Sequence, residues 1–293
     1  MTTSPNTSVL AIDGGGTRCR CALERSDGRI VVETGSANAY TDFDGTIHQL
    51  QNGIRSLAEQ ANTPIETLCD LPAFVGLAGV TGDAVVARLT AALPLRNVRY
   101  ADDRLAAARG ALGRDDGVIA HCGTGSFFAA QINGNTRFAG GWGAILGDEA
   151  SAQWIGRKAL TRILRHVDGF DQSSALSDEI LARFKTAHAI VVFARTAKPA
   201  ELGALAPLVT KHAETGDPIA MAILQSGADH IATDLRQMGW ALGVGICLTG
   251  GIGQHYAPYL SDDMKDALTQ PLGTPLDGAI SLARDMELID GHF

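Results

Sequence analysis

The feature that most constrains this chain is an apolar run that ends in one carboxylate, three glycines and a threonine. Val9 to Ile12 predict a buried strand, and Asp13 follows directly before Gly14-Gly15-Gly16-Thr17. Glycines can take positive φ and let the backbone approach an anion, so that successive N–H groups point at phosphate oxygens. An extended pattern resumes from Arg18 to Glu24 and predicts a strand–turn–strand hairpin. Because dinucleotide-binding and Walker loops need a helix after the turn, both are disfavoured. Phosphate binding and a plain tight hairpin both stay open.

Length and charge set wide limits on the rest of the molecule. A chain of 293 residues has room for two medium domains or one large one. The net charge of -8 argues against a general nucleic-acid binder. Met1 to Ser8 do not have the pattern of a signal peptide, and no apolar stretch is long enough to span a bilayer, so we expect a cytoplasmic protein without a membrane partner. Five cysteines without a CxxC pair indicate neither a disulfide framework nor a zinc site.

The first part of the chain predicts an antiparallel meander followed by alternating helices and strands. Arg29 to Thr34 form a third strand after the turn at Asp27-Gly28, and a long amphipathic helix covers Thr46 to Ala61. Two further strands then alternate with two further helices, which implies a parallel part of the sheet. The strands cover residues 72–79 and 97–101, and the helices cover 83–93 and 103–112.

The opening pattern then repeats. Gly117 to Cys122 predict a strand that runs into Gly123-Thr124-Gly125-Ser126, and two more strands follow. Two such units more than a hundred residues apart suggest a duplicated domain in which each copy brings its turn to a shared cleft. Residues 149–230 are mainly helical in pattern, and a last strand from Gly245 leads into Thr249-Gly250-Gly251-Ile252-Gly253.

These three turns stand in the order seen in the actin/hexokinase/Hsp70 ATPase superfamily, and the chain resembles its BadF/BadG-type branch. Within that branch it looks most like the N-acetylglucosamine kinases and bacterial glucosamine kinases over almost its whole length. The further matching segments are Ser36-Ala37-Asn38, Asp102-Asp103, Gly140-Gly141-Trp142-Gly143 and Gly147-Asp148-Glu149-Ala150-Ser151.

The resemblance implies an α/β fold of two ribonuclease-H-like lobes, with mixed sheets flanked by helices and a cleft between the lobes. Residues 1–115 would form the N-terminal lobe, joined by the C-terminal helix 278–293. Residues 116–277 would form the C-terminal lobe with a helical insertion. The resemblance also implies a homodimer.

The implied activity is transfer of the γ-phosphoryl group of ATP, with Mg²⁺, to the 6-hydroxyl of an amino sugar. Asp103 matches the catalytic base of the family, and Asp13 would organise Mg²⁺ through water. The phosphates would be bound by Gly14, Gly15, Gly16, Thr17, Gly123 and Thr124, and the adenosine by Gly250 and Gly251. The sugar would be bound by Asn38, Asp103, Thr124, Gly141, Trp142 and Asp148.

Each role has a plainer alternative. Asp103 could be an ordinary first-turn carboxylate, with Asp102 as the base. Asn38 and Asp13 could each cap a turn, and Asp148 with Glu149 could be the N-terminal charges of the next helix. Trp142 could simply pack over its own turn and seal it. Gly250 and Gly251 could simply be the pair of glycines at which a helix begins.

The motifs also leave the substrate and two rival functions open. The segment Gly147 to Ser151 is similar to the N-acetylglucosamine kinases, whereas residues 189–218 and 275–279 are similar to the glucosamine kinases. One rival function is an ATPase that activates a dehydratase or reductase through an iron–sulfur cluster shared between two subunits. Such a cluster needs cysteines in an exposed loop, whereas Cys122 and Cys247 fall inside predicted strands. The other is a non-catalytic sugar sensor, although no helix-turn-helix precedes Val9 and the matching aspartate is present.

Overall fold

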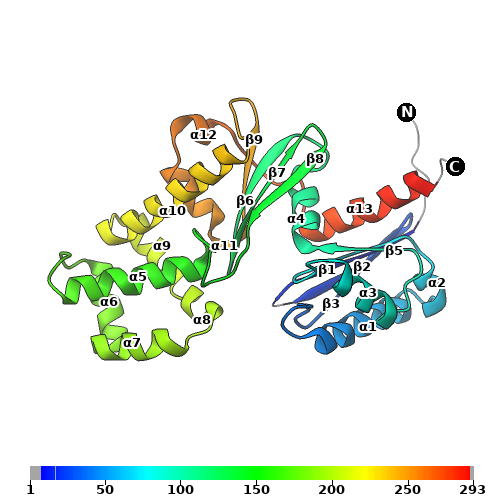
Figure 1. The fold of residues 1–293 in the computed structure, drawn as a ribbon, viewed down its shortest axis with the longest axis horizontal. Helices are drawn as coiled ribbons and strands as arrows, with labels where there is room; N and C mark the ends of the chain where they lie inside the picture. The colour runs from blue at the N-terminus through cyan, green and yellow to red at the C-terminus, as the bar shows by residue number, and fades with distance from the viewer. Residues whose placement is uncertain (1–7, 17, 291–293) are drawn as a thin grey trace. The chain divides into compact units, whose positions relative to one another are not determined.

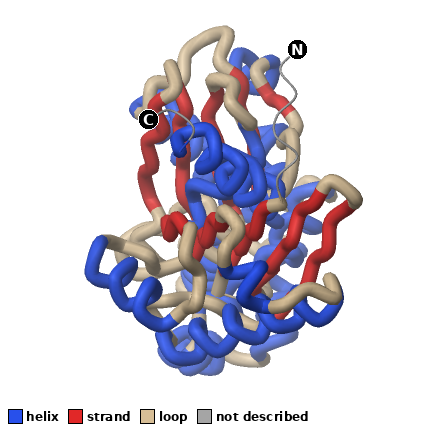
Figure 2. Tube along the Cα trace, turned by 90° about the vertical axis from the view of Figure 1, so that its right-hand side faces the viewer, coloured by secondary structure: helices blue, strands red, loops and turns tan. Residues whose placement is uncertain are grey.

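The protein is described here by a computed structural model that covers residues 8–16 and 18–290. The chain divides into two compact units. Unit 1 contains residues 1–114 and 271–293, and unit 2 contains residues 115–270. Each unit is built on one five-stranded sheet with helices against it (Figure 2).

The sheet of unit 1 has the strand order β3-β2-β1-β4-β5. β1 pairs antiparallel with β2, and β2 pairs antiparallel with β3, while β4 and β5 continue the sheet parallel to β1. The expected strand–turn–strand hairpin and the parallel part of the sheet are therefore confirmed. The strands are β1 (Val9–Gly14), β2 (Cys19–Arg25), β3 (Gly28–Thr34), β4 (Ala73–Leu77) and β5 (Val98–Asp102).

Helices cover both faces of this sheet (Figure 1). One face packs on α1 (Phe43–Gln60), α2 (Ile65–Cys69) and α3 (Asp83–Ala92), and the other packs on α4 (Asp103–Leu112) and α13 (Pro275–Asp290). Alternation along β1 explains the arrangement, because side chains of a strand point to opposite faces in turn. Leu10 and Ile12 belong to the first core and Val9 and Ala11 to the second, and all four are fully buried.

Two glycines let α13 approach α4 closely. A Cβ at Gly278 would overlap the carbonyl oxygen of Ala106, and a Cβ at Gly110 would overlap that of Thr274. Backbone contact at this range is possible only where side chains are absent. The C-terminal helix is thus part of the core of unit 1.

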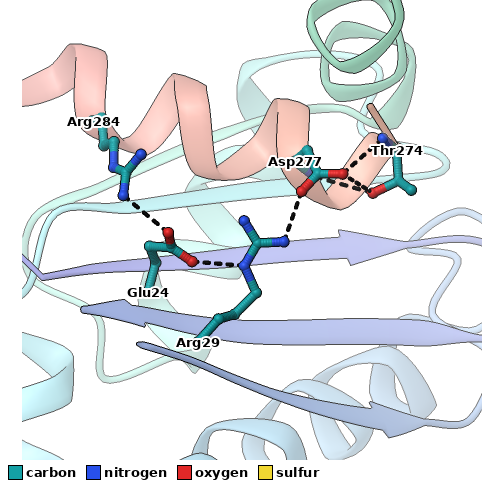
Figure 3. A network of polar contacts seen from close by, with 5 residues as sticks. All are labelled: Glu24, Arg29, Thr274, Asp277 and Arg284. Atoms are coloured by element: carbon teal, nitrogen blue, oxygen red, sulfur yellow. Dashed lines mark hydrogen bonds and ion pairs between the residues drawn. The ribbon is translucent and has the colours of Figure 1, made fainter. Parts of the chain in front are cut away.

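A polar network also connects α13 to β2 and β3 (Figure 3). Arg29 donates from Nε to Glu24 at 2.6 Å and from Nη1 to Asp277 at 2.7 Å. Arg284 donates to the other oxygen of Glu24 at 3.0 Å, and Thr274 donates to Asp277 from both its backbone nitrogen and its hydroxyl. The network spans segments about 250 residues apart in sequence, which stabilises their pairing through several charges rather than one exposed ion pair.

The sheet of unit 2 repeats the plan, with the order β10-β9-β6-β7-β8. β6, β7 and β8 form an antiparallel meander, and β9 pairs parallel to β6 as β4 pairs to β1. The repeat expected from the two Gly/Thr turns is therefore confirmed. The strands are β6 (Gly117–Cys122), β7 (Ser126–Ile132), β8 (Asn135–Gly140), β9 (Gly245–Thr249) and β10 (Leu268–Thr269).

The crossover from β8 to β9 is long and helical, as the sequence predicted. It comprises α5 (Ala152–Val167), α6 (Ala175–Phe184), α7 (Ala187–Thr196), α8 (Pro199–Gly203), α9 (Ala206–Glu214) and α10 (Pro218–Gln237). After β9 come α11 (Gly250–Gly253), the 3-10 helix η1 (Gln254–Tyr259) and α12 (Asp262–Asp266). Asp217 caps α10 by accepting from the backbone nitrogens of Ile219 and Ala220, both at 3.0 Å. Among the residues that the structure describes, no helix has the length and apolar character that a membrane span requires.

Candidate active site

Asp13 lies at the end of β1, where the first glycine turn begins. It pairs with Arg20 on β2 and with Gly76 on β4. Burial raises the pKa of its carboxyl, although the charges of Arg20 and Arg18 act in the opposite direction. The turn is closed by Gly15 N–H, which donates to the carbonyl of Arg18 at 3.0 Å. The side chain of Asp13 therefore stands next to a backbone turn that can receive an anion.

The glycines of this turn differ in what requires them. A Cβ at Gly14 would overlap the side chain of Leu77, so packing excludes a side chain there. Gly16 is exposed, and a Cβ there would meet nothing within 4 Å. Space at Gly16 is thus available to a ligand. Thr17, the fourth phosphate-binding residue that we expected here, lies outside the described residues.

Asp103 opens α4 directly after β5. Gly76 brings it near Asp13, because a Cβ at Gly76 would lie 3.5 Å from the Cα of Asp103. The pKa of Asp103 is raised to about 7, chiefly by burial and then by the negative charges of Asp102 and Asp13. A carboxylate with a pKa near the operating pH is suited to accept a proton from a hydroxyl group.

Asp102 is engaged differently from its neighbour. It is the N-cap of α4, and its Oδ1 accepts from the backbone nitrogen of Arg104 at 3.0 Å and from Nε of Arg104 at 2.7 Å. Its Oδ2 accepts from Nη2 of Arg104 at 3.2 Å. Both oxygens of Asp102 thus accept from Arg104, and a further side-chain hydrogen bond joins Asp102 to Asp103.

Asn38 lies beside the end of β4, where it forms an isolated parallel bridge with Ala78. Its Oδ1 accepts from the backbone nitrogens of Tyr40 at 3.0 Å and Thr41 at 3.2 Å. The turn-capping alternative is therefore present in the structure. A sugar contact by Asn38 would use the amide nitrogen, which can donate two hydrogen bonds.

In unit 2 the turn Gly123-Thr124-Gly125-Ser126 lies at the start of α5. Gly123 N–H donates to the carbonyl of Gly125 at 2.9 Å, and Ala152 N–H donates to the carbonyl of Gly123 at 2.8 Å. The carbonyls of this turn are thus used inside the unit, while Thr124 is exposed. A turn held in this way can offer backbone N–H groups and one hydroxyl to a phosphate.

Asp148 is buried against this turn. A Cβ at Gly125 would lie 2.8 Å from its Oδ2, and the backbone N–H groups of Ser126 and Gly143 donate to its carboxylate. Burial is the largest influence on its pKa, which is raised despite these hydrogen bonds. Asp148 precedes the N-cap of α5, Ser151, so it is not a first-turn charge of that helix.

The backbone around Asp148 is strained and firmly held. Asp148 has φ +60° and Ala150 has φ +63°, a region that side chains other than glycine rarely adopt. Ser126 donates to the carbonyl of Glu149 at 2.6 Å, and Tyr256 donates to that of Ala150 at 2.9 Å. Strain of this kind persists only where the surrounding structure imposes it, and it concentrates at functional sites.

Gly141 and Trp142 begin the loop that leads to Asp148. Gly141 has φ +75°, and Trp142 is 76% exposed. Ile145 and Leu146 in the same loop are exposed at 91% and 81%. Trp142 therefore does not seal its turn by packing, and its ring is available for contact.

The third turn follows β9. Gly250 has φ +79°, and a Cβ there would overlap the carbonyl of Cys122, so only glycine fits. Gly251 is exposed, and a Cβ there would meet nothing within 4 Å. These glycines do open a short helix, α11 (Gly250–Gly253), as the plainer alternative expects. Packing within the protein does not require a glycine at position 251, however.

His121 was not identified from the sequence. It lies near the end of β6, and a Cβ at Gly123 would be 3.1 Å from its Nε2. Burial lowers its pKa to about 4, so the imidazole is neutral at physiological pH. A histidine two residues before a glycine turn, within an otherwise apolar strand, was the available signal.

Within unit 1 the structure places Asp13 and Asp103 beside Gly76, with Asn38 beside the end of the same strand. Within unit 2 it places the turn from Gly123, Asp148 and Gly250 around the end of β6. The described residues contain no group of three or more acidic, histidine or cysteine side chains that could hold a metal ion by themselves. A metal at Asp13 would therefore need ligands from water or from a bound phosphate.

The chain is similar to known proteins over most of its length. Residues 10–274 match the model of the BadF/BadG/BcrA/BcrD ATPase family. The glucosamine kinase GspK of Vibrio cholerae is 27% identical over 94% of this chain and 95% of its own length. The N-acetylmuramic acid/N-acetylglucosamine kinase of Clostridium acetobutylicum is 24% identical over 94% of each chain. A crystal structure of a candidate N-acetylglucosamine kinase from Chromobacterium violaceum matches with a TM-score of 0.82 and 28% identity, over 95% of this chain and 99% of that one. The expected fold class, α/β with two mixed sheets flanked by helices, is confirmed.

Proposed function

The chain belongs to the BadF/BadG/BcrA/BcrD ATPase family, and we propose from that premise that it is an ATP-dependent amino-sugar kinase. It would transfer the γ-phosphoryl group of ATP to the 6-hydroxyl of glucosamine or N-acetylglucosamine. The observation that carries the proposal is Asp103, a partly buried carboxylate at a helix start with a pKa of about 7. The kinases named among its relatives support the substrate class.

Asp103 would orient the sugar hydroxyl and accept its proton as the oxygen attacks the γ-phosphorus. Phosphoryl transfer needs little covalent chemistry from a protein and depends on alignment and charge stabilisation. A second carboxylate, Asp13, contributes to the raised pKa of Asp103 and so favours the proton-accepting role near neutral pH.

The turns would bind the nucleotide through backbone groups. Gly14, Gly15 and Gly16 would contact phosphate oxygens, and Gly123 and Thr124 would do the same from unit 2. Gly250 and Gly251 would lie against the adenosine. The open space at Gly251, where a Cβ would meet nothing within 4 Å, supports this proposal. We also propose that Thr17 contacts a phosphate oxygen, and this part of the proposal rests on the sequence resemblance alone.

Asp13 fits a magnesium ion held mainly through water and ATP phosphate. It is a hard oxygen ligand beside a phosphate turn, and the described residues offer no closed cage of ligands. When bound, Mg²⁺ supplies neutralisation of phosphate charge. Asp13 would hold the hydrated ion in position.

The sugar would be bound by Asn38, Asp148, Gly141 and Trp142, together with Thr124 and Asp103. The carboxylate of Asp148 can accept hydrogen bonds from two sugar hydroxyl groups. The backbone N–H groups of Ser126 and Gly143 donate to this carboxylate and fix its position. Trp142 can stack on the apolar face of a sugar ring. The homodimer and the cytoplasmic location remain part of the proposal.

The burial of the cysteines does not favour the activator ATPase. All five, Cys19, Cys21, Cys69, Cys122 and Cys247, are buried. A cluster shared between subunits needs thiolates that reach the surface.

The proposal is tested by ADP release with ATP and a panel of glucosamine, N-acetylglucosamine and glucose. We expect turnover with at least one amino sugar, and Asp103→Asn should lower kcat by at least ~10²-fold while ATP binding is kept. Chelation of Mg²⁺ should stop turnover. No turnover with any amino sugar would refute the substrate class, and near-normal activity of Asp103→Asn would refute the assignment of the base.

A further inference from the structure

The side chain of His121 is fixed from two neighbouring strands. His121 pairs in register with Phe127 on β7 and with Thr249 on β9. Its ring stacks on Phe127, with centroids 4.9 Å apart and planes 19° apart, and its Nδ1 lies 3.0 Å from Oγ1 of Thr249. The plane of the imidazole and its direction are therefore both determined.

This imidazole connects the two turns of unit 2. Nε2 abuts Gly123, the first residue of the phosphate turn, where a Cβ would lie 3.1 Å away. Nδ1 is bound to Thr249, which directly precedes Gly250 and begins α11. Thr249 is the N-cap of α11 but makes no side-chain cap bond, so its hydroxyl serves the histidine instead.

The contact differs from simple packing in one respect. An apolar side chain could stack on Phe127 and fill the same volume, but it could not bind Thr249. A neutral imidazole has one N–H and one lone pair, so it can bind the hydroxyl without adding charge beside the turn. The hydrogen bond is thus the part of the arrangement that a structural filler does not need.

We propose that His121 is a positioning residue that holds the phosphate turn, Gly123 to Ser126, in register with the adenosine turn, Gly250 and Gly251. A nucleotide that contacts both turns would then bind more tightly than the separate contacts of its two parts imply. This inference rests on the proposed use of ATP. It adds a role for a residue that touches neither the nucleotide nor the sugar in that proposal.

The test compares three ligands by titration calorimetry on the full chain: ADP with Mg²⁺, adenosine and pyrophosphate. His121→Gln removes the group at the Nδ1 position and keeps an amide near the Nε2 position, while Thr249→Val removes the hydroxyl at nearly constant volume. Either change should lower the affinity for ADP about fivefold, which is the effect of losing one neutral hydrogen bond. The affinities for adenosine and for pyrophosphate should each change by less than about twofold, because each of these ligands contacts one turn only.

His121→Asn is the matched control, since its amide can reach the position of Nδ1 and should restore ADP affinity to near wild type. The double variant His121→Gln/Thr249→Val should lose no more than either single variant. The positioning role would be overturned if both single variants bound ADP as tightly as the wild type. It would also be overturned if the affinity for adenosine or for pyrophosphate fell as much as the affinity for ADP. If His121→Gln does not fold, Thr249→Val still tests the same hydrogen bond. A wild-type protein that binds no ADP would instead refute the proposed function itself.

Discussion

Replacing Asp102 by asparagine should shift the pH dependence of turnover toward acid without removing the proposed base. The negative charge of Asp102 is the second cause, after burial, of the raised pKa of Asp103. An asparagine can still accept the capping bond from the backbone of Arg104 but carries no charge. The change also releases Arg104 from its ion pair, and the positive charge of Arg104 already lowers the pKa of Asp103. Both effects lower the pKa of Asp103.

The size of the shift follows from the order of these causes. Burial is unchanged in the variant, so the pKa of Asp103 should stay above its ordinary value and fall by on the order of one unit. With a pKa of about 7, roughly a tenth of Asp103 is ionised at about pH 6. With a pKa one unit lower, about half is ionised, so kcat/KM at about pH 6 relative to its alkaline plateau should rise about fivefold.

The assay is kcat/KM for the amino sugar across the pH range, because this ratio reports groups of the free enzyme. Asp70→Asn is a suitable control, since it also removes a carboxylate from an ion pair, here with Arg96, and Asp70 is not among the groups that shift the pKa of Asp103. An acidic limb that stays in place or moves toward alkali would refute the reasoning. Loss of activity in Asp102→Asn, with an active Asp103→Asn, would make Asp102 the base.

Two further predictions concern stability. Folded Asp103 keeps its proton up to a pH of about 7, whereas the unfolded residue loses it near 3.8, so the wild type loses stability as the pH rises through this window. Asp103→Asn should therefore raise the free energy of unfolding by about 2–4 kcal/mol at about pH 8 and change it little at about pH 4, as measured by urea denaturation; an equal effect at both pH values would contradict this. Gly278→Ala should lower the free energy of unfolding by about 1–3 kcal/mol through overlap with Ala106. Gly203→Ala, where the nearest atom to the new Cβ lies at 3.4 Å, should not lower it; equal effects of the two changes in thermal denaturation would argue against close packing as the cause.

The two sheets share one plan but differ in what their turns carry. Unit 1 carries Asp13 near the end of β1 and Asp103 at the start of α4, directly after β5. In unit 2, β6 takes the place of β1 in the sheet and carries His121 near its end. A duplicated fold can thus hold different chemistry at equivalent places, because the strand ends are set by backbone pairing and the side chains there are free to differ.

The acidic segment before α5 shows why local sequence is not enough for the site. Asp148 and Glu149 stand just before a helix, and charges at such a place commonly serve its N-terminus. The structure instead turns Asp148 into the protein at positive φ and sets its carboxylate against Gly125. That contact joins residues from two turns, and no periodicity in the sequence carries it.

The helices and strands and their order could be predicted from local sequence patterns. The glycine turn after Asp13, its repeat at Gly123 and the alternation of apolar residues along β1 depend on local backbone freedom and on side-chain periodicity, which neighbouring residues encode directly. The partners and the burial of the site side chains come instead from tertiary contacts. Asp102 accepts from Arg104, the charge of Asp13 raises the pKa of Asp103, and His121 reaches Thr249 from another strand. These contacts depend on burial and on distances between strands far apart in the chain, and such distances exist only once the sheets have formed.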